Sequence, residues 1–120
     1  MEQSNSCTSF DWIEHYPLAV DVCDREGTLI AMNRLAAENF KSWGGTALLG
    51  KSVFDCHPPA ANAMIRRMLK EQCANTYATE KQGQRKLVHQ CPWYDSTGAF
   101  AGLVETIIPL PPEVPVFQRG

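Results

Sequence analysis

Cys56 and His57 are adjacent and precede two prolines in the stretch FDCHPPAANAMIRRML, residues 54–69. Imidazole and thiolate groups both bind iron and zinc, and a thiol beside an imidazolium at a helix N-terminus has a lowered pKa. The pair is therefore a candidate for haem or metal binding or for redox chemistry. A structural explanation stays open, in which Cys56 fills a buried position and His57 hydrogen-bonds backbone groups that are unpaired where a helix begins.

His89 is the second histidine whose position could carry chemistry. The alternation of a predicted strand over residues 85–94 places it in the more apolar row, together with Leu87, Cys91 and Trp93. There it could be a second ligand or a polar anchor for a small molecule, or an ordinary strand histidine with satisfied hydrogen bonds. Catalysis would need a nucleophile and a base converging from separate elements. Nothing else in the sequence supports this, so we expect no enzymatic activity.

Composition excludes several classes. The net charge is -2 and no basic run is present, which argues against nucleic-acid binding. The N-terminus MEQSNSCTSF lacks a basic leader with an apolar run, and no stretch approaches the roughly 18 apolar residues of a membrane span. We therefore expect a cytoplasmic protein. Five scattered cysteines without a CxxC spacing support neither a disulfide framework nor a structural zinc site.

The first half of the chain predicts a helix, a hairpin and short helices. TSFDWIEHY, with Thr8 or Ser9 as its cap, has helical spacing up to Pro17. Strands over 18–23 and 29–32 flank turn residues 24–27. Asn33 is placed to cap a helix over 34–40, and the glycines of 41–50 predict short helices and loops.

The second half predicts one longer helix and three strands. From Ala60 onward the apolar residues follow a helical stripe, which comprises Ala61, Met64, Ile65, Met68, Leu69 and Cys73. Pro58 and Pro59 fit the start of this helix. Strands over 75–81, 85–94 and 99–110 are joined by short turns and predict an antiparallel meander, followed by a proline-rich extended tail over 111–120. The whole is a five-stranded antiparallel sheet with helices on one face, an α+β fold.

The order of these elements resembles the PAS domain, a small sensor fold, from about Asp11 to Leu110. DREGTLIAMNRLAAENF is similar to the usual PAS opening D-x-x-G-x-I-x-x-x-N-x-x-A, and DSTGAFAGLVET to the closing hairpin D-x-x-G-x-x-x-G. LLGKSVFD resembles the short glycine-led helix between them. Gly50, Val53 and residues 56–59 fit a pattern, G-x-x-V-x-x-CHPP, of a bacterial PAS subgroup. The resemblance implies residues 1–16 as a capping helix region, 17–110 as the PAS domain and 111–120 as a tail.

The resemblance also implies an interior pocket between the sheet and the helices, which in PAS domains holds haem, flavin or a small molecule. The side chains expected near its wall are aromatic, sulfur-containing or imidazole groups: Phe40, Trp43, Phe54, Cys56, His57, Met64, Met68, His89, Cys91 and Trp93. Haem on His57 is one alternative for the cofactor. A flavin–cysteine photoadduct is not expected, because Val53 stands where the photoactive cysteine would be.

The expected function is that of a sensory, signal-transducing PAS domain that binds a small molecule or cofactor and relays occupancy to a protein partner. The alternative is a ligand-free interaction module, in which the N-terminal helix with Phe10, Trp12, Ile13 and Tyr16 and the sheet form a homodimer. A third hypothesis is a thiol redox sensor at Cys56. The stretch IIPLPP replaces the D-I-T that often leads into a signalling helix, so a coiled-coil output is not expected.

Overall fold

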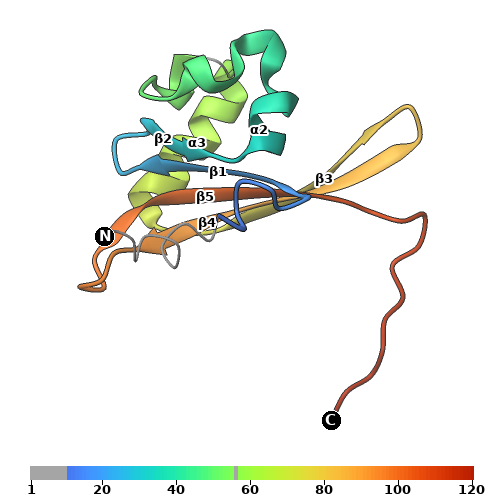
Figure 1. Ribbon diagram of the computed structural model, residues 1–120. Coiled ribbons are helices and arrows are strands. Elements are labelled where there is room, and N and C mark those ends of the chain that lie inside the picture. Colours follow the sequence, from blue (N-terminus) through green and yellow to red (C-terminus); the bar gives the residue numbers. More distant parts are fainter. Residues whose placement is uncertain (1–10, 56) are drawn as a thin grey trace, which may run out of the picture.

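A computed structural model describes residues 11–55 and 57–120 of the chain. Five strands form one antiparallel sheet in the order β2-β1-β5-β4-β3 (Figure 1). Their bounds are β1 Ala19–Asp24, β2 Leu29–Met32, β3 Asn75–Lys81, β4 Gln84–Tyr94 and β5 Phe100–Pro109. The predicted α+β fold with five antiparallel strands is confirmed. The last strand of the chain is the central strand of the sheet, so the two halves of the sequence meet along β5.

Tight turns explain the hairpins of this sheet. The side chain of Asp24 accepts hydrogen bonds from the backbone N–H groups of Glu26 and Thr28, each at 2.9 Å. Gly27 follows with a φ of 85°, a conformation that glycine adopts without a steric penalty. The side chain of Asp95 makes the same kind of turn between β4 and β5. These local hydrogen bonds set the register in which β1 pairs with β2 and β4 with β5.

Short helices connect the first hairpin to the longer helix. Helix α2 spans Arg34–Asn39, and the 3-10 helices η1, η2 and η3 span Lys41–Trp43, Gly45–Leu48 and Val53–Asp55. Asn33 is the N-cap of α2, as predicted. Its Oδ1 accepts hydrogen bonds from the backbone N–H groups of Ala36 and Val20, and its Nδ2 donates to the Leu18 carbonyl oxygen at 2.8 Å. One buried side chain therefore joins the start of α2 to β1.

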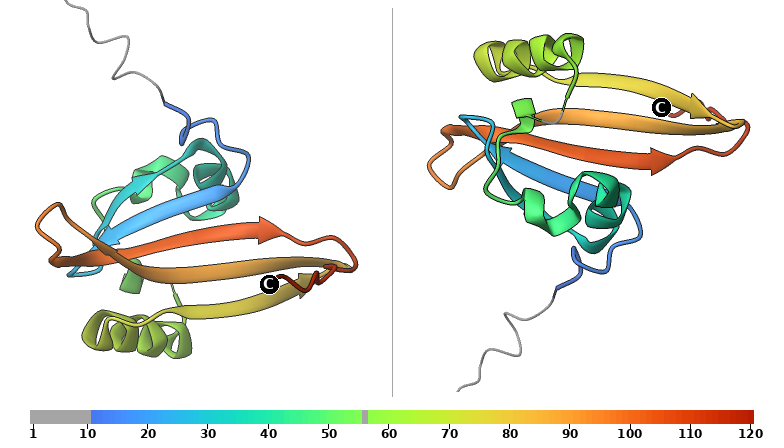
Figure 2. Two further views of the ribbon diagram at one scale, coloured as in Figure 1. Left: turned by 90° about the horizontal axis from the view of Figure 1, so that it is seen from below. Right: turned by 90° about the horizontal axis from the view of Figure 1, so that it is seen from above.

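The longer helix, α3, spans Pro59–Glu71 and begins where the prolines predicted. Pro58 is its N-cap, and Gln72, in the left-handed conformation, is its C-cap. The backbone N–H of Gln72 donates to the Met68 carbonyl oxygen, with 2.7 Å between nitrogen and oxygen. The predicted stripe faces the core: Ile65 and Met68 are buried there. Figure 2 shows α3 beside β3 and α2 beside β1 and β2, so the two helices lie over opposite edges of the sheet.

The predicted N-terminal helix is wrong over the residues that the structure describes. Residues 11–16 form turns in which Glu14 N–H bonds to the Asp11 carbonyl and Tyr16 N–H to the Ile13 carbonyl. A single helical turn has too few hydrogen bonds to offset its ordering cost, and Pro17 prevents its extension. The proposed caps Thr8 and Ser9, together with Phe10, lie outside the described residues.

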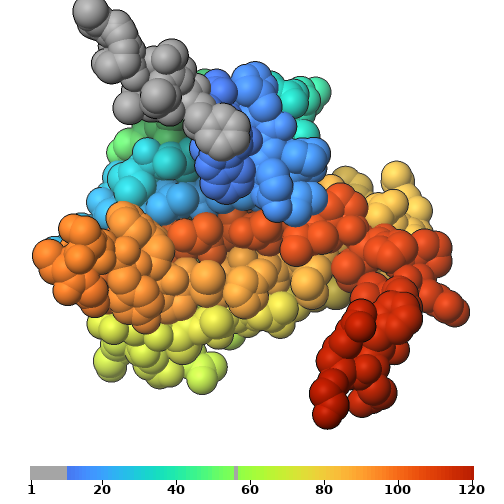
Figure 3. All heavy atoms as spheres, turned by 60° about the horizontal axis from the view of Figure 1, so that its bottom comes forward, coloured from blue at the N-terminus to red at the C-terminus, as the bar shows by residue number. Residues whose placement is uncertain are grey.

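The C-terminal residues and the outer face of the sheet form part of the surface. Residues 111–120 contain no helix or strand and run away from the sheet (Figure 1). Within the described part of the chain, none of the helices has the length and apolarity that crossing a membrane requires. Figure 3 shows the sheet face opposite the helices, where side chains of β4 and β5 reach the surface.

Candidate functional site

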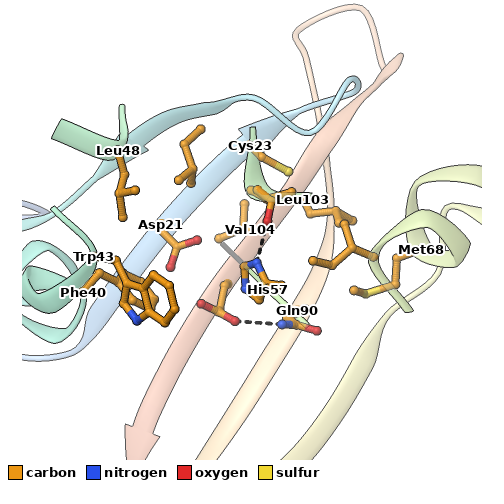
Figure 4. Close-up of a pocket in the computed structure, with 14 residues that line it drawn as sticks. Asp21, Cys23, Phe40, Trp43, Leu48, His57, Met68, Gln90, Leu103 and Val104 are labelled. Atoms are coloured by element: carbon orange, nitrogen blue, oxygen red, sulfur yellow. Dashed lines mark hydrogen bonds between the residues drawn. The ribbon is translucent and has the colours of Figure 1, made fainter. Parts of the chain in front are cut away.

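A cavity of about 210 Å³ lies above the middle of the sheet, between its two helical edges. Most of its wall is apolar or aromatic. The wall residues that belong to the core or pack against it are Cys23, Leu29, Phe40, Leu48, Val53, Ile65, Met68 and Leu103, and the exposed Trp43 adds to the wall. Strands β1, β5 and β4 form its floor, with Asp21, Glu105 and Gln90 among the lining residues. Figure 4 shows side chains from both helical edges and from the strands converging on this space. The cavity thus has an apolar wall and a polar floor.

The polar floor is a line of side chains that crosses four strands. Asp21 on β1 pairs with Glu105 on β5, Glu105 pairs with Gln90 on β4, and Gln90 pairs with Asn75 on β3. Gln90 Nε2 donates to Glu105 Oε2 at 2.7 Å, and Asn75 Nδ2 donates to Gln90 Oε1 at 3.2 Å. Because directly paired residues point to the same face, this line lies on one side of the sheet. Both amides are oriented toward the carboxyl pair.

Burial and mutual repulsion change the acidity of this site. Burial, followed by the negative charge of Glu105 and a hydrogen bond to it, raises the pKa of Asp21 well above its ordinary value. Burial also raises the pKa of the Cys23 thiol and of the Tyr77 hydroxyl. Low-dielectric surroundings disfavour charge, so the carboxyl group of Asp21 releases its proton less readily than an exposed aspartate does.

His57 lines the cavity on the side of η3. Its Nδ1 is 2.6 Å from the Val53 carbonyl oxygen (Figure 4). A carbonyl oxygen only accepts, so Nδ1 carries the hydrogen and donates. Nearby, Asn62 Nδ2 of α3 donates to the Phe54 carbonyl oxygen at 2.9 Å. Two carbonyl groups of η3 are therefore satisfied by side chains that follow it in the sequence.

The sequence-predicted site residues that the structure describes fall into three groups. Phe40, Trp43, His57 and Met68 line the cavity. Phe54 and Met64 pack against the core cluster without lining the cavity. Cys56 lies outside the described residues, so its proposed haem, metal and thiol roles stay predictions.

The strand residues form the third group, and they lie on the other face of the sheet. His89, Cys91 and Trp93 alternate with Gln90, which lines the cavity. His89 Nδ1 is 2.8 Å from the Thr76 hydroxyl oxygen on β3, and Trp93 Nε1 donates to the Cys23 carbonyl oxygen at 3.1 Å. The more apolar row of β4 therefore faces away from the cavity.

Sequence reasoning missed Asp21, Gln90 and Glu105. Asp21 alternates with Val20 and Val22, and a charged residue in such a row normally faces solvent. The available signal was an acidic residue within each of two largely apolar strands, Asp21 in β1 and Glu105 in β5. Without the register of β1 against β5, the sequence does not show that these two acidic residues are neighbours.

Two observations limit the groups that the cavity could hold. In the part of the chain that the structure describes, no three His, Cys, Asp or Glu side chains are grouped so that they could hold a metal ion. The cavity is also small, since drug-sized ligands occupy roughly 300–1,000 Å³. A porphyrin is much larger than the space here, so the residues present do not fit haem as they stand.

The sheet order, with helices over both of its edges and a cavity beneath them, defines a small α+β domain with an interior site. The model of the PAS fold family matches residues 13–110, and the chain belongs to this family. No curated protein sequence matches the chain.

Solved structures show the same fold. The PAS domain of BvgS from Bordetella pertussis gives a TM-score of 0.64 at 20% identity, covering 91% of this chain and 88% of that one. The Aer2 receptor from Vibrio cholerae, described as a dual PAS-haem oxygen sensor, gives 0.59 at 12% identity over 78% and 95%. VqmA from Vibrio cholerae, described as a dimer and a LuxR-type receptor, gives 0.65 at 16% identity over 87% and 52%. At these identities the likeness concerns the fold.

Proposed function

We propose that this PAS domain is a non-enzymatic sensor, which binds a small molecule in the interior cavity and relays its occupancy to a protein partner. The observation that carries the proposal is the cavity of about 210 Å³ with an apolar wall and a few convergent polar groups, the usual make-up of a small-molecule site. An apolar cavity of about 150 Å³ accepts benzene. The cavity therefore suits a molecule built on one ring.

The relay is proposed to run through the sheet. Strands β1, β5 and β4 supply the cavity floor, and their alternate residues form the opposite face of the same sheet. A ligand that shifts these strands also shifts the surface on which a partner can dock. A bacterial, cytoplasmic signalling protein is the setting that we propose, in line with the bacterial receptors that share the fold.

Native mass spectrometry with an absorption spectrum tests the proposal on protein purified without added cofactor. We expect a bound molecule of small mass at one per chain, and its loss in His57→Ala, which alters the cavity wall. The matched control is His89→Ala, which removes the same side chain from the opposite face and should keep the ligand. A folded wild-type protein that is empty in cell extract and accepts no small ring compound would contradict the proposal. A Soret band that depends on His57 would show that the cavity expands to hold haem.

The outer face of the sheet favours a second candidate function, a homodimerisation or interaction module. This face is formed mainly by half-buried apolar residues on three strands: Val20, Val22, Leu87, Cys91, Val104 and Ile108. Trp12 and Ile13 add exposed apolar surface. Because interface centres are poor in charge, Thr106→Lys on this face should reduce a concentration-dependent mass in sedimentation. Thr79→Lys, on the exposed β3–β4 hairpin, should not. A wild-type mass that stays monomeric at all concentrations would remove homodimerisation.

A further inference from the structure

On the polar floor of the cavity, one carboxyl oxygen is an acceptor that no donor of the described residues reaches. Asp21 Oδ2 is buried, and no hydrogen-bond partner for this one oxygen is found among the residues that the structure describes. Figure 4 shows the Asp21 carboxyl group pointing into the space enclosed by the lining side chains, on the side of Trp43. A buried carboxylate oxygen without a partner costs more than one that accepts a hydrogen bond. The site therefore favours any ligand that brings a donor to this oxygen.

Because the neighbouring residue Glu105 is also acidic, we expect the donor that a ligand brings to this oxygen to be cationic. Glu105 is directly paired with Asp21, and only its Oε2 receives the amide of Gln90. Two adjacent carboxyl groups in a poorly solvated site hold less than two negative charges unless a cation joins them. Among the described residues that line the cavity, none is a lysine or an arginine. The lining group that can carry positive charge is His57, and its Nδ1–H is directed at the Val53 carbonyl oxygen.

The remaining wall suits a ring attached to that cation. Leu29, Leu48 and Met68 supply apolar surface, and Phe40 and Trp43 supply two aromatic groups. Trp43 is 62% exposed, so it stands at the mouth of the cavity rather than in its depth. The face of an indole attracts cations as well as apolar rings. An incoming cationic ring thus meets a favourable surface before it reaches the carboxyl pair.

We propose that the cavity binds a small organic cation, a single-ring amine or amidine, whose charged nitrogen donates hydrogen bonds to Asp21 Oδ2 and Glu105 while its ring contacts the apolar wall. This inference rests on the proposed sensory function and names the class of its ligand. Gln90 and Asn75 orient the carboxyl of Glu105 from the other side. The ligand brings a positive charge to a carboxyl pair whose described lining neighbours include neither lysine nor arginine.

Three probes of nearly equal size test the charge of the ligand: benzylammonium, benzyl alcohol and benzoate. Calorimetric titration into the full chain at neutral pH should show benzylammonium binding about tenfold or more tightly than benzyl alcohol, since hydrogen bonds to charged groups are the stronger ones. Benzoate should bind most weakly. In Asp21→Asn and in Glu105→Gln the preference for the cation should fall to within about threefold of the alcohol. Asp95→Asn, which removes a distant exposed carboxylate, should leave the preference intact.

The outcomes distinguish a failure of the cationic ligand class from a failure of the proposed sensory function. Equal binding of the alcohol and the ammonium, or a native ligand that is neutral or anionic by mass, overturns the cationic class and keeps the sensor. Binding of none of the three at millimolar concentrations, with an empty native spectrum, overturns both. Two variants are used so that misfolding of one, detected by circular dichroism, leaves the other to decide. A preference for the cation that survives both substitutions contradicts the assigned carboxyl pair.

Discussion

Asp21 on β1 and Glu105 on β5 occupy directly paired positions, and both line the interior cavity. Carboxyl groups rarely face each other inside an apolar wall, because burial and repulsion both act against their charge. Here the consequence is a raised pKa at Asp21. Within the described part of the chain, Oδ2 of this residue also has no hydrogen-bond partner. A carboxyl group with a perturbed pKa that lines a cavity is a candidate for a functional site.

The pH dependence of stability should carry the signature of Asp21. Its raised folded-state pKa means that the folded chain holds the proton more tightly than the unfolded chain. The associated stabilisation is therefore fully present below the ordinary aspartate pKa and is lost as the pH rises through the raised value. Urea unfolding across this range should show wild-type protein losing stability relative to Asp21→Asn as the pH increases. A constant difference between the two proteins would count against a perturbed Asp21.

Asp95 provides a control with the opposite sign. Hydrogen bonds from the Thr97 side chain and from the backbone N–H groups of Thr97 and Ala99 lower the pKa of this exposed carboxyl. Its contribution is present above the ordinary aspartate pKa and is lost as the pH falls through the lowered value. As the pH falls through this range, Asp95→Asn should therefore lose less stability than the wild-type protein does. The same urea titrations measure both variants, and equal slopes at acid pH for wild type and Asp95→Asn would contradict this account.

Gly102 should not tolerate a side chain. A Cβ on this residue would overlap the Cys23 carbonyl oxygen and lie 2.8 Å from the Cα of Asp24, both belonging to β1. We expect Gly102→Ala to lower the free energy of unfolding by about 3 kcal/mol or more, because backbone cannot move aside as a flexible side chain does. Gly83→Ala is the matched control: its φ is 79° with open space around it, so about 1–2 kcal/mol is expected. Thermal unfolding of both variants measures the difference, and similar losses would disprove the steric explanation.

Asn33 should be essential to the junction of β1 and α2. It is 3% exposed and forms three hydrogen bonds with backbone groups of Leu18, Val20 and Ala36. Asn33→Ala removes a helix cap and leaves buried backbone groups unsatisfied, so a loss of about 2–4 kcal/mol is expected. Asn33→Asp keeps the acceptor and loses the donor to Leu18, and should cost less. Denaturant titration ranks the two, and a milder effect of alanine than of aspartate would contradict the assignment.

The sequence predicted those parts of the fold that local chemistry determines. Asn33, Pro58 and Pro59 mark helix starts through capping and fixed φ values, and the stripe around Met68 marks the buried face of α3. These features depend on residues within one or two turns of one another. The same reasoning failed for residues 11–16, where helical spacing was present but too few residues could follow before Pro17.

The floor of the site could not be predicted in the same way. Both rows of β4 contain apolar residues, so alternation does not reveal that Gln90 rather than His89 faces the cavity. Asp21 and Glu105 are 84 positions apart in the chain, and only the pairing of β1 with β5 makes them neighbours. The register between the first and last strands depends on the whole fold and cannot be read from a short stretch of sequence. The adjacent Cys56 and His57, in contrast, can be seen in a short stretch.

The sheet is a single layer, and at its central strand this has a further consequence. Glu105 belongs to the cavity floor, while Thr106, the next residue, pairs with Val20 and His89 on the opposite face. At this point, one peptide bond separates the interior of the molecule from its exterior. A displacement of the Glu105 backbone is also a displacement of Thr106, with no packed layer between them to absorb it. The cavity floor and the outer face of the sheet are therefore separated by the thickness of a single strand.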